Sequence, residues 1–349
     1  MKYVIYYISV ALLLSSCTTS IRLTSIETLE PALVTFPPEV TRVVIVNNSP
    51  TPQDEEDANH QKNDSPQILS LDSVRTIMLN SLNQFMNEEA YFTQVALYPY
   101  KTNNSPILKD VTPLSRRKVQ SICSETKADA LISLDMFAVT AQIESENTAY
   151  FTNYSILKAN LGSIIRVFSK DGDQYISKMT YVDSLFSEGP AFWDVKRNYI
   201  AEVNTLITDL AIVGADKLTG KFIPSWKKRN RWYYLDGSSE MKQAAGYAEQ
   251  GNWQQASDIW ENLYAKETKP KKKAKLASNI ALAKECLDEI DEAYQWIETS
   301  FEQLPEEKSK SDLVTQIAIY KHDLYLRKVN KEKLKDQLGI IEDDEYIEE

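Results

Sequence analysis

The sequence predicts an α+β domain, with helices packed on a mixed sheet, followed by an all-α domain of helical repeats. Two observations carry this prediction. Up to about residue 225, runs rich in β-branched residues alternate with segments that have apolar residues at helical spacing. From about residue 239 the strand-like runs stop, and small and aromatic residues recur at a period close to that of paired-helix repeats. A chain of 349 residues is long enough for both domains.

The N-terminus carries a short apolar run that ends at Cys17, within VALLLSSCTTS at 10–20. A dozen residues have the length of a signal-peptide core and are too few to span a bilayer, which takes about 20. The segment LSSC resembles the lipobox of bacterial lipoproteins, which implies cleavage of residues 1–16 and a lipid anchor on Cys17. An ordinary secretory peptide with an incidental cysteine is the alternative.

The residues after Cys17 bear on localisation. Thr18 follows it, with neither an aspartate beside it nor an acidic run beyond. By resemblance to lipoprotein sorting signals, this implies the periplasmic face of an outer membrane, and a Gram-positive cell surface is the alternative. No later stretch is apolar for long enough to span a bilayer, so the anchor is the only membrane attachment expected.

The α/β domain is assigned to residues 17–225. Its order β-α-β-α-β-β-β-α predicts a mixed sheet, with Pro190 opening the last helix and Gly220 ending it. The polar stretch 49–66 cannot bury a core, so it is predicted to be a disordered loop. The expected strands are 21–29, 39–48, 91–100, 129–144 and a hairpin over 161–184, and the expected helices are 71–88, 113–128 and 190–220. This order resembles the periplasmic α/β domains of envelope-assembly lipoproteins, a topological likeness that implies little about function.

The helical domain is assigned to residues 239–338, with an acidic and disordered tail over 339–349. Its first unit resembles a tetratricopeptide repeat, and a second unit follows in which Asp288 replaces the turn glycine. The positions that carry the pattern, all expected to be structural, are Ala244, Tyr247, Gly251, Trp253, Ala256, Trp260, Ala281 and Ala293. The whole layout resembles a family of uncharacterised bacterial envelope lipoproteins.

Composition argues against several classes of function. A net charge of −11 disfavours nucleic-acid binding, which needs a basic face. Nine glycines and two histidines leave little for phosphate loops, catalytic triads or histidine metal sites, so neither a metal nor another cofactor is expected. Cys123 and Cys286 are expected to be small core residues, and an interdomain disulfide is the alternative.

A connector over 226–238 holds the one candidate interaction surface. Its cations alternate with aromatic residues: Trp226, Lys227, Lys228, Arg229, Arg231 and Trp232. Such a segment can bind an anionic lipid, a glycan or an acidic partner. The alternative, which we favour, is that the aromatic residues pack on the first repeat while the cations stay in water.

We therefore expect a lipid-anchored, non-enzymatic adaptor or assembly factor that binds other envelope proteins through its helices. One alternative is a cell-wall or glycan-processing hydrolase that uses acids such as Glu144, Glu146, Asp183 and Glu188, although nothing in their spacing distinguishes them. Another is a regulator of a wall enzyme or of a secretion pore.

Overall fold

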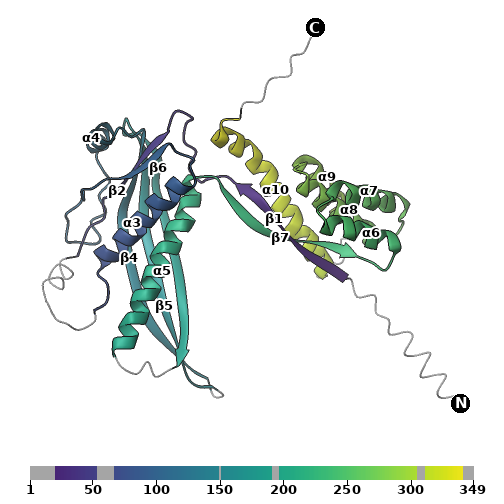
Figure 1. Ribbon diagram of the computed structural model, residues 1–349, viewed down its shortest axis with the longest axis horizontal. Helices are drawn as coiled ribbons and strands as arrows, with labels where there is room; N and C mark the ends of the chain where they lie inside the picture. Colours follow the sequence, from purple (N-terminus) through teal and green to yellow (C-terminus); the bar gives the residue numbers. More distant parts are fainter. Residues whose placement is uncertain (1–19, 53–66, 149–150, 191–195, 305–310, 341–349) are drawn as a thin grey trace, which may run out of the picture. The chain divides into compact units, whose positions relative to one another are not determined.

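The computed structural model describes residues 20–52, 67–148, 151–190, 196–304 and 311–340 (Figure 1). The chain divides into two compact units. We call residues 31–225 together with 335–349 the sheet unit, and residues 1–30 together with 226–334 the helical unit. A mixed sheet with helices comes first and a run of helices follows, which confirms the predicted fold class.

The sheet unit is built on a five-stranded sheet in the order β3-β2-β4-β5-β6. Strand β2 lies parallel to both β3 and β4, whereas β4, β5 and β6 form an antiparallel meander. The strand bounds are β2 Arg42–Asn47, β3 Gln94–Leu97, β4 Ala130–Thr148, β5 Phe151–Ser169 and β6 Gln174–Pro190. The turn between β5 and β6 uses the predicted Asp-Gly pair, and Gly172 has a φ of +84°, which favours glycine.

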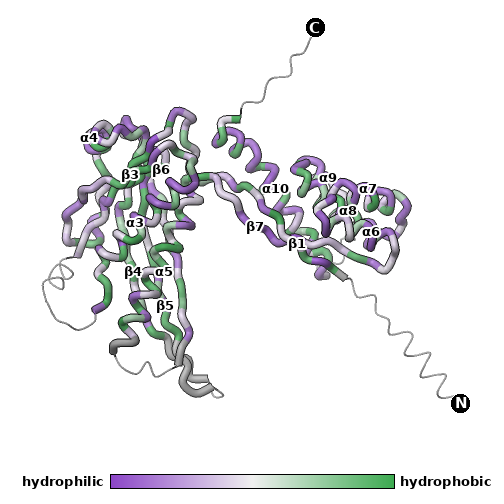
Figure 2. The backbone as a smooth tube through the Cα atoms, viewed as in Figure 1, coloured by the Kyte–Doolittle hydropathy of each residue, from purple (hydrophilic) through white to green (hydrophobic). Residues whose placement is uncertain are grey.

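Two helices, α3 (Leu71–Glu88) and α5 (Lys196–Phe222), lie side by side on one face of the sheet (Figure 1). Their apolar residues close the main core together with alternate residues of β2, β4 and β5. Hydrophobic residues recur along α5 and β5 (Figure 2). Gly214 of α5 faces the sheet, and an added Cβ would lie at ordinary contact distances, 3.6 Å from the ring of Tyr181 and 3.7 Å from Leu161.

A smaller core lies on the other face. Helix α4 (Arg116–Thr126) packs Val119 and Ile122 against Val44 and Val46, the alternate residues of β2. Strand β2 is therefore buried on both faces, which explains its continuous apolar sequence.

Several predicted boundaries in this unit differ from the structure. The hairpin predicted over 161–184 is longer, because β5 begins at Phe151 and β6 ends at Pro190. Pro190 is the last residue of β6, paired with Tyr154, and does not open α5. Helix α5 continues through Gly220 because Phe222 is fully buried in the core. Within the predicted loop 49–66, Ser49 is buried because Arg75 binds the carbonyl oxygens that follow β2.

The helical unit combines a two-stranded sheet with a run of helices. Strand β1 (Ser20–Glu30) pairs with β7 (Ser225–Leu235), although the first segment is predicted to belong to the α/β domain and the second to a connector. The pairing of residues about 200 positions apart leaves no local signal in the sequence. The helices are α6 Ser239–Glu249, α7 Trp253–Lys266, α8 Pro270–Cys286, α9 Ile290–Glu302 and α10 Asp312–Leu338.

Several predictions fall outside the described residues: the signal peptide, Cys17, most of the 49–66 loop and nearly all of the acidic tail. In the part of the chain that the structure describes, no helix combines the length and apolarity needed to cross a bilayer.

Candidate functional site: strand β7 and its helices

Strand β7 has an inner half held by the helices and an outer half open to solvent. Arg231 and Tyr234 are buried at 3% and 1% exposure, whereas Trp226 is 65% exposed. The structure thus divides the predicted interaction surface. Arg231 and Trp232 belong to the interior or its edge, and the exposed residues are Trp226, Lys227, Lys228 and Arg229.

A buried charge cluster fixes the inner half of β7. Arg231 binds both oxygens of Glu285 on α8, at 2.8 and 3.0 Å, and Arg327 of α10 reaches the same carboxylate at 2.9 Å. The hydroxyl of Tyr320 donates to Glu285 Oε2 at 2.8 Å. Burial alone would raise the pKa of Glu285, but the hydrogen bonds and charges of the two arginines outweigh it and hold the pKa below its usual value. The cluster therefore ties β7 to two helices.

Asn279 of α8 clamps the backbone of the same strand. Its amide oxygen accepts from the N–H of Tyr234 at 2.7 Å, and its amide nitrogen donates to the carbonyl of Tyr234 at 2.8 Å. The ring of Tyr233 packs 5.9 Å from that of Trp260. One side chain thus satisfies both backbone groups of Tyr234.

The positions that suggested repeats lie mainly inside the helical unit. Ala244, Ala256, Trp260, Ala281 and Ala293 are all fully buried, and Tyr247 and Trp253 are half-buried. Gly251 has a φ of +76°, and Asp288, at the corresponding turn, has a φ of 62°. This arrangement suits close helix packing and gives none of these residues a chemical role.

Helix α10 carries an exposed apolar stripe. Ile319, Leu326 and Val329 are 53%, 44% and 53% exposed, and they recur with His322 at spacings of three and four residues. At about 100° per residue these side chains share one face. The opposite face holds Ile317, Tyr320 and Leu324, which are buried in the helical core. We call the set Ile319, His322, Leu326 and Val329 the α10 stripe.

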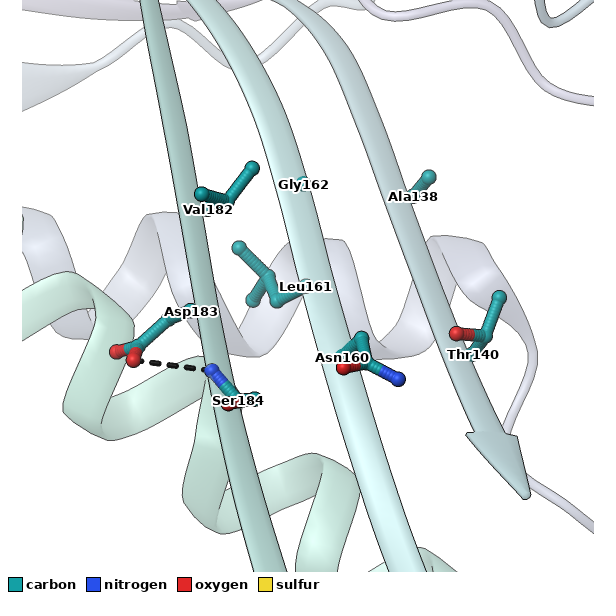
Figure 3. A pocket seen from close by; sticks show the side chains of 8 residues that line it. All are labelled: Ala138, Thr140, Asn160, Leu161, Gly162, Val182, Asp183 and Ser184. Atoms are coloured by element: carbon teal, nitrogen blue, oxygen red, sulfur yellow. Dashed lines mark hydrogen bonds between the residues drawn. The ribbon is translucent and has the colours of Figure 1, made fainter.

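The sheet unit has a shallow hollow on its open face (Figure 3). The hollow measures about 550 Å³ and lies over Gly162, where an added Cβ would meet nothing within 4 Å. Because Leu161 points into the core, alternation places Gly162 on the face away from α3 and α5. The lining residues are Ala138, Thr140, Asn160, Leu161, Gly162, Val182, Asp183 and Ser184. None of these is a histidine or a cysteine.

The four carboxylates considered for hydrolysis do not all lie on one face of the sheet, although Glu144 and Glu188 occupy register positions on either side of Ile156. Asp183 and Glu188 are five residues apart on β6, so their side chains lie on opposite faces. Asp183 accepts from Lys217 of α5 at 2.7 Å and from the hydroxyl of Tyr181 at 2.8 Å. Burial alone would raise the pKa of Asp183, but these hydrogen bonds lower it. Residues Glu144 and Glu146 lie on β4, at register positions opposite Ile156 and Tyr154.

Sequence reasoning missed a second set of buried charges, in the sheet unit. Asp135 is fully buried and accepts from Asn48 at 2.8 Å, from Ser133 at 2.5 Å and from Arg166. Arg75 is also fully buried and pairs with Asp72 of its own helix. The one available signal was a charged residue inside an otherwise apolar strand or helix stripe.

Among the described residues, no group of histidine, cysteine, aspartate and glutamate side chains is arranged to hold a metal ion. Cys123 and Cys286 are both free thiols. Burial raises the pKa of Cys123 to about 11 and that of Cys286 to about 12, so neither is activated as a nucleophile.

The geometry defines a protein with a mixed α/β sheet unit and a separate helical unit. Residues 40–234, more than half of the chain, match the model of a family described as "Domain of unknown function (DUF8603)". The chain belongs to that family. Residues 242–326 match a second model, "Domain of unknown function (DUF6340)". No curated protein matches the chain.

Some solved structures resemble it weakly. A minor lipoprotein from Acinetobacter baumannii has 8% identity and a TM-score of 0.28, over 54% of this chain and 96% of that one. Rare lipoprotein B from Shewanella oneidensis has 7% identity and a TM-score of 0.25, over 52% and 92%. The hypothetical protein CT253 from Chlamydia trachomatis has 10% identity and a TM-score of 0.26, over 52% and 97%. Likenesses this weak define neither the fold nor the role of the chain.

Proposed function

We propose that this chain is a lipid-anchored protein of the cell envelope that acts as a non-enzymatic adaptor or assembly factor. Its helical unit, with α6–α7 and α8–α9 as two tetratricopeptide-like repeats, binds another envelope protein. The observation that carries the binding role is the α10 stripe, an exposed apolar face at the end of the helical run.

Three exposed apolar residues and a histidine, at spacings of three and four along α10, suit a helix as the partner. Side chains at these positions form the seam along which two helices pack. Terminal repeats of helical arrays normally have a polar outer face, and α10 departs from this rule. We therefore assign the α10 stripe to an amphipathic helix of a partner protein.

The anchor is tested by mass spectrometry of the N-terminal peptide from cells. We expect it to begin at Cys17 and to carry diacylglycerol and acyl groups. A Cys17→Ala chain should lose that mass and stay unprocessed. A peptide that begins elsewhere, or an unmodified cysteine, contradicts the anchor. Fractionation of the envelope then tests the proposed periplasmic face of the outer membrane.

Binding is tested by crosslinked co-purification from intact envelopes. We expect Leu326→Glu to remove a defined partner that the wild-type chain retains, because a charge would be buried in the apolar seam. Gln243→Glu is the matched control, since it adds the same charge at an exposed position of α6. Retention of the partner by the Leu326→Glu chain contradicts the role of the stripe.

A hydrolase has less support. Asp183 is held by Lys217 and Tyr181 in a structural arrangement, and its side chain lies on the face away from Glu188. We expect the Asp183→Asn chain to lose stability and to leave digestion of cell-wall fragments unchanged. A loss of turnover specific to Asp183→Asn or Glu188→Gln would favour the enzyme.

A further inference from the structure

The ribbon formed by β1 and β7 has a side packed on the helices and a side that is exposed over β1 and the first half of β7. On β1 the buried residue is Thr28, and on β7 the buried residues are Arg231, Tyr233 and Tyr234. Glu30 pairs with Arg229 at 2.8 Å. Because side chains alternate along a strand, this ion pair places the even-numbered residues of β1 and the odd-numbered residues of β7 on the same face. That face is the inner one.

The outer face therefore carries the odd-numbered residues of β1 and, in the exposed half of β7, Trp226 and Lys228. Further along β7, Tyr234 is buried and its hydroxyl donates to Gln316 of α10, so the outer face ends before it. The outer face exposes Ile21 at 41%, Leu23 at 73% and Trp226 at 65%. Lys228 is exposed on the same face, and so is one acid, Glu27. Aliphatic residues, a tryptophan and a lysine are the combination found where proteins meet the boundary between lipid and water.

The sequence sets the distance between this face and the proposed anchor. Ile21 is the fourth residue after Cys17. A fully extended chain spans at most about 3.6 Å per residue, so Ile21 lies within about 15 Å of the acylated cysteine. An anchored chain thus keeps the start of β1 in or beside the headgroup layer.

We propose that the outer face of the β1–β7 ribbon lies on the bilayer and binds anionic phospholipid headgroups. This inference rests on the proposed acylation of Cys17. Ile21 and Leu23 enter the interface beside the anchor, Trp226 enters it further along the ribbon, and Lys228 contacts the phosphates. A lysine near an anionic surface strengthens binding by about fivefold. The ribbon thereby fixes how the anchored chain meets the membrane.

The experiment uses the full acylated chain reconstituted in vesicles whose phosphatidylcholine has brominated acyl chains, with and without phosphatidylglycerol. Bromine quenches tryptophan fluorescence at short range. We expect quenching in the wild type, greater with phosphatidylglycerol, and loss of most of it in the Trp226→Phe chain. Trp253→Phe, at a half-buried position of α7, is the matched control and should leave the quenching unchanged.

Equal quenching in the wild-type and Trp226→Phe chains, or none in either, overturns the proposal. Quenching that is the same with and without phosphatidylglycerol overturns the headgroup contact, and Lys228→Gln should then have no effect. The mass of the reconstituted protein records acylation of Cys17 separately. An acylated chain without Trp226 quenching therefore contradicts the ribbon and leaves the anchor standing.

Discussion

At the scale of single residues, Glu285 is the centre of a buried network of polar contacts in the helical unit. It accepts hydrogen bonds from Arg231, Tyr320 and Arg327, which come from a strand and from the last helix. Both Arg231 and Glu285 have almost no exposure to solvent. A buried carboxylate of this kind contributes to stability only while its partners remain.

We predict that Glu285→Gln lowers the free energy of unfolding of the helical unit by about 3–5 kcal/mol, because the arginine charges lose their counterion. Urea unfolding measures this. Glu289→Gln is the control. Glu289 pairs with Lys284 at 2.7 Å but is 40% exposed, so its loss should cost less than about 1 kcal/mol. Equal losses in the two variants would contradict the assignment.

The same variant has a defined dependence on pH. The pKa of Glu285 lies below its ordinary value of 4.5, so its stabilisation is complete above that value. It is lost as the pH falls through the lower pKa of the folded state. The difference in unfolding free energy between wild type and Glu285→Gln should therefore stay constant at neutral pH and shrink only below 4.5. A difference that shrinks on going from neutral to alkaline pH would contradict this account.

Asn279 is the second residue whose loss should release β7. We predict that Asn279→Ala costs about 2–4 kcal/mol, because it leaves a buried N–H and a buried carbonyl of Tyr234 without partners. Hydrogen exchange of the Tyr234 amide should rise with it. Asn262→Ala, on the exposed side of α7, removes a hydrogen bond to the carbonyl of Asp258 and should cost under about 0.5 kcal/mol. A Tyr234 amide that stays protected in the Asn279→Ala chain would show that the clamp is dispensable.

At the scale of elements, two glycines differ in whether their position can accept a side chain. Gly214 lies inside α5, where a Cβ would make ordinary contacts, so Gly214→Ala should stabilise the sheet unit by about 0.5–1 kcal/mol. Gly172 has a φ of +84°, and a Cβ there would lie 3.1 Å from Arg116 Cα, so Gly172→Ala should destabilise by about 1–2 kcal/mol. Thermal unfolding followed by circular dichroism gives both signs. The same sign for both variants would contradict the packing described here.

The elements also show what the sequence could predict. Periodicity identified α3 and the β5–β6 hairpin because each is specified by neighbouring residues: an apolar stripe with a cap at Ser70, and an Asp-Gly turn. Strand β7 was missed because its basic, exposed half has no apolar alternation and its partner β1 lies about 200 residues earlier in the chain. The Arg231–Glu285 pair could not be predicted for the same reason, because its two residues lie far apart in the sequence and meet only in the folded chain.

At the scale of the whole molecule, sequence predicted the α+β unit followed by helices, and the described residues bear this out. The sequence could not predict which apolar surfaces remain exposed to solvent. The α10 stripe has the same apolar periodicity as a buried helix face, and only the exposures of Ile319, Leu326 and Val329 distinguish it. We expect a partner protein to cover that stripe in the envelope.

The most direct test places a photoreactive amino acid at position 326 of the anchored chain and irradiates intact cells. We predict one discrete adduct from position 326, its loss when Val329→Glu is added, and no such adduct from position 243 on α6. Loss of the adduct with a single charge at Val329 would identify the α10 stripe as the contact. The same adduct from both positions, or an adduct that Val329→Glu leaves unchanged, would contradict the claim that this protein binds its partner through α10.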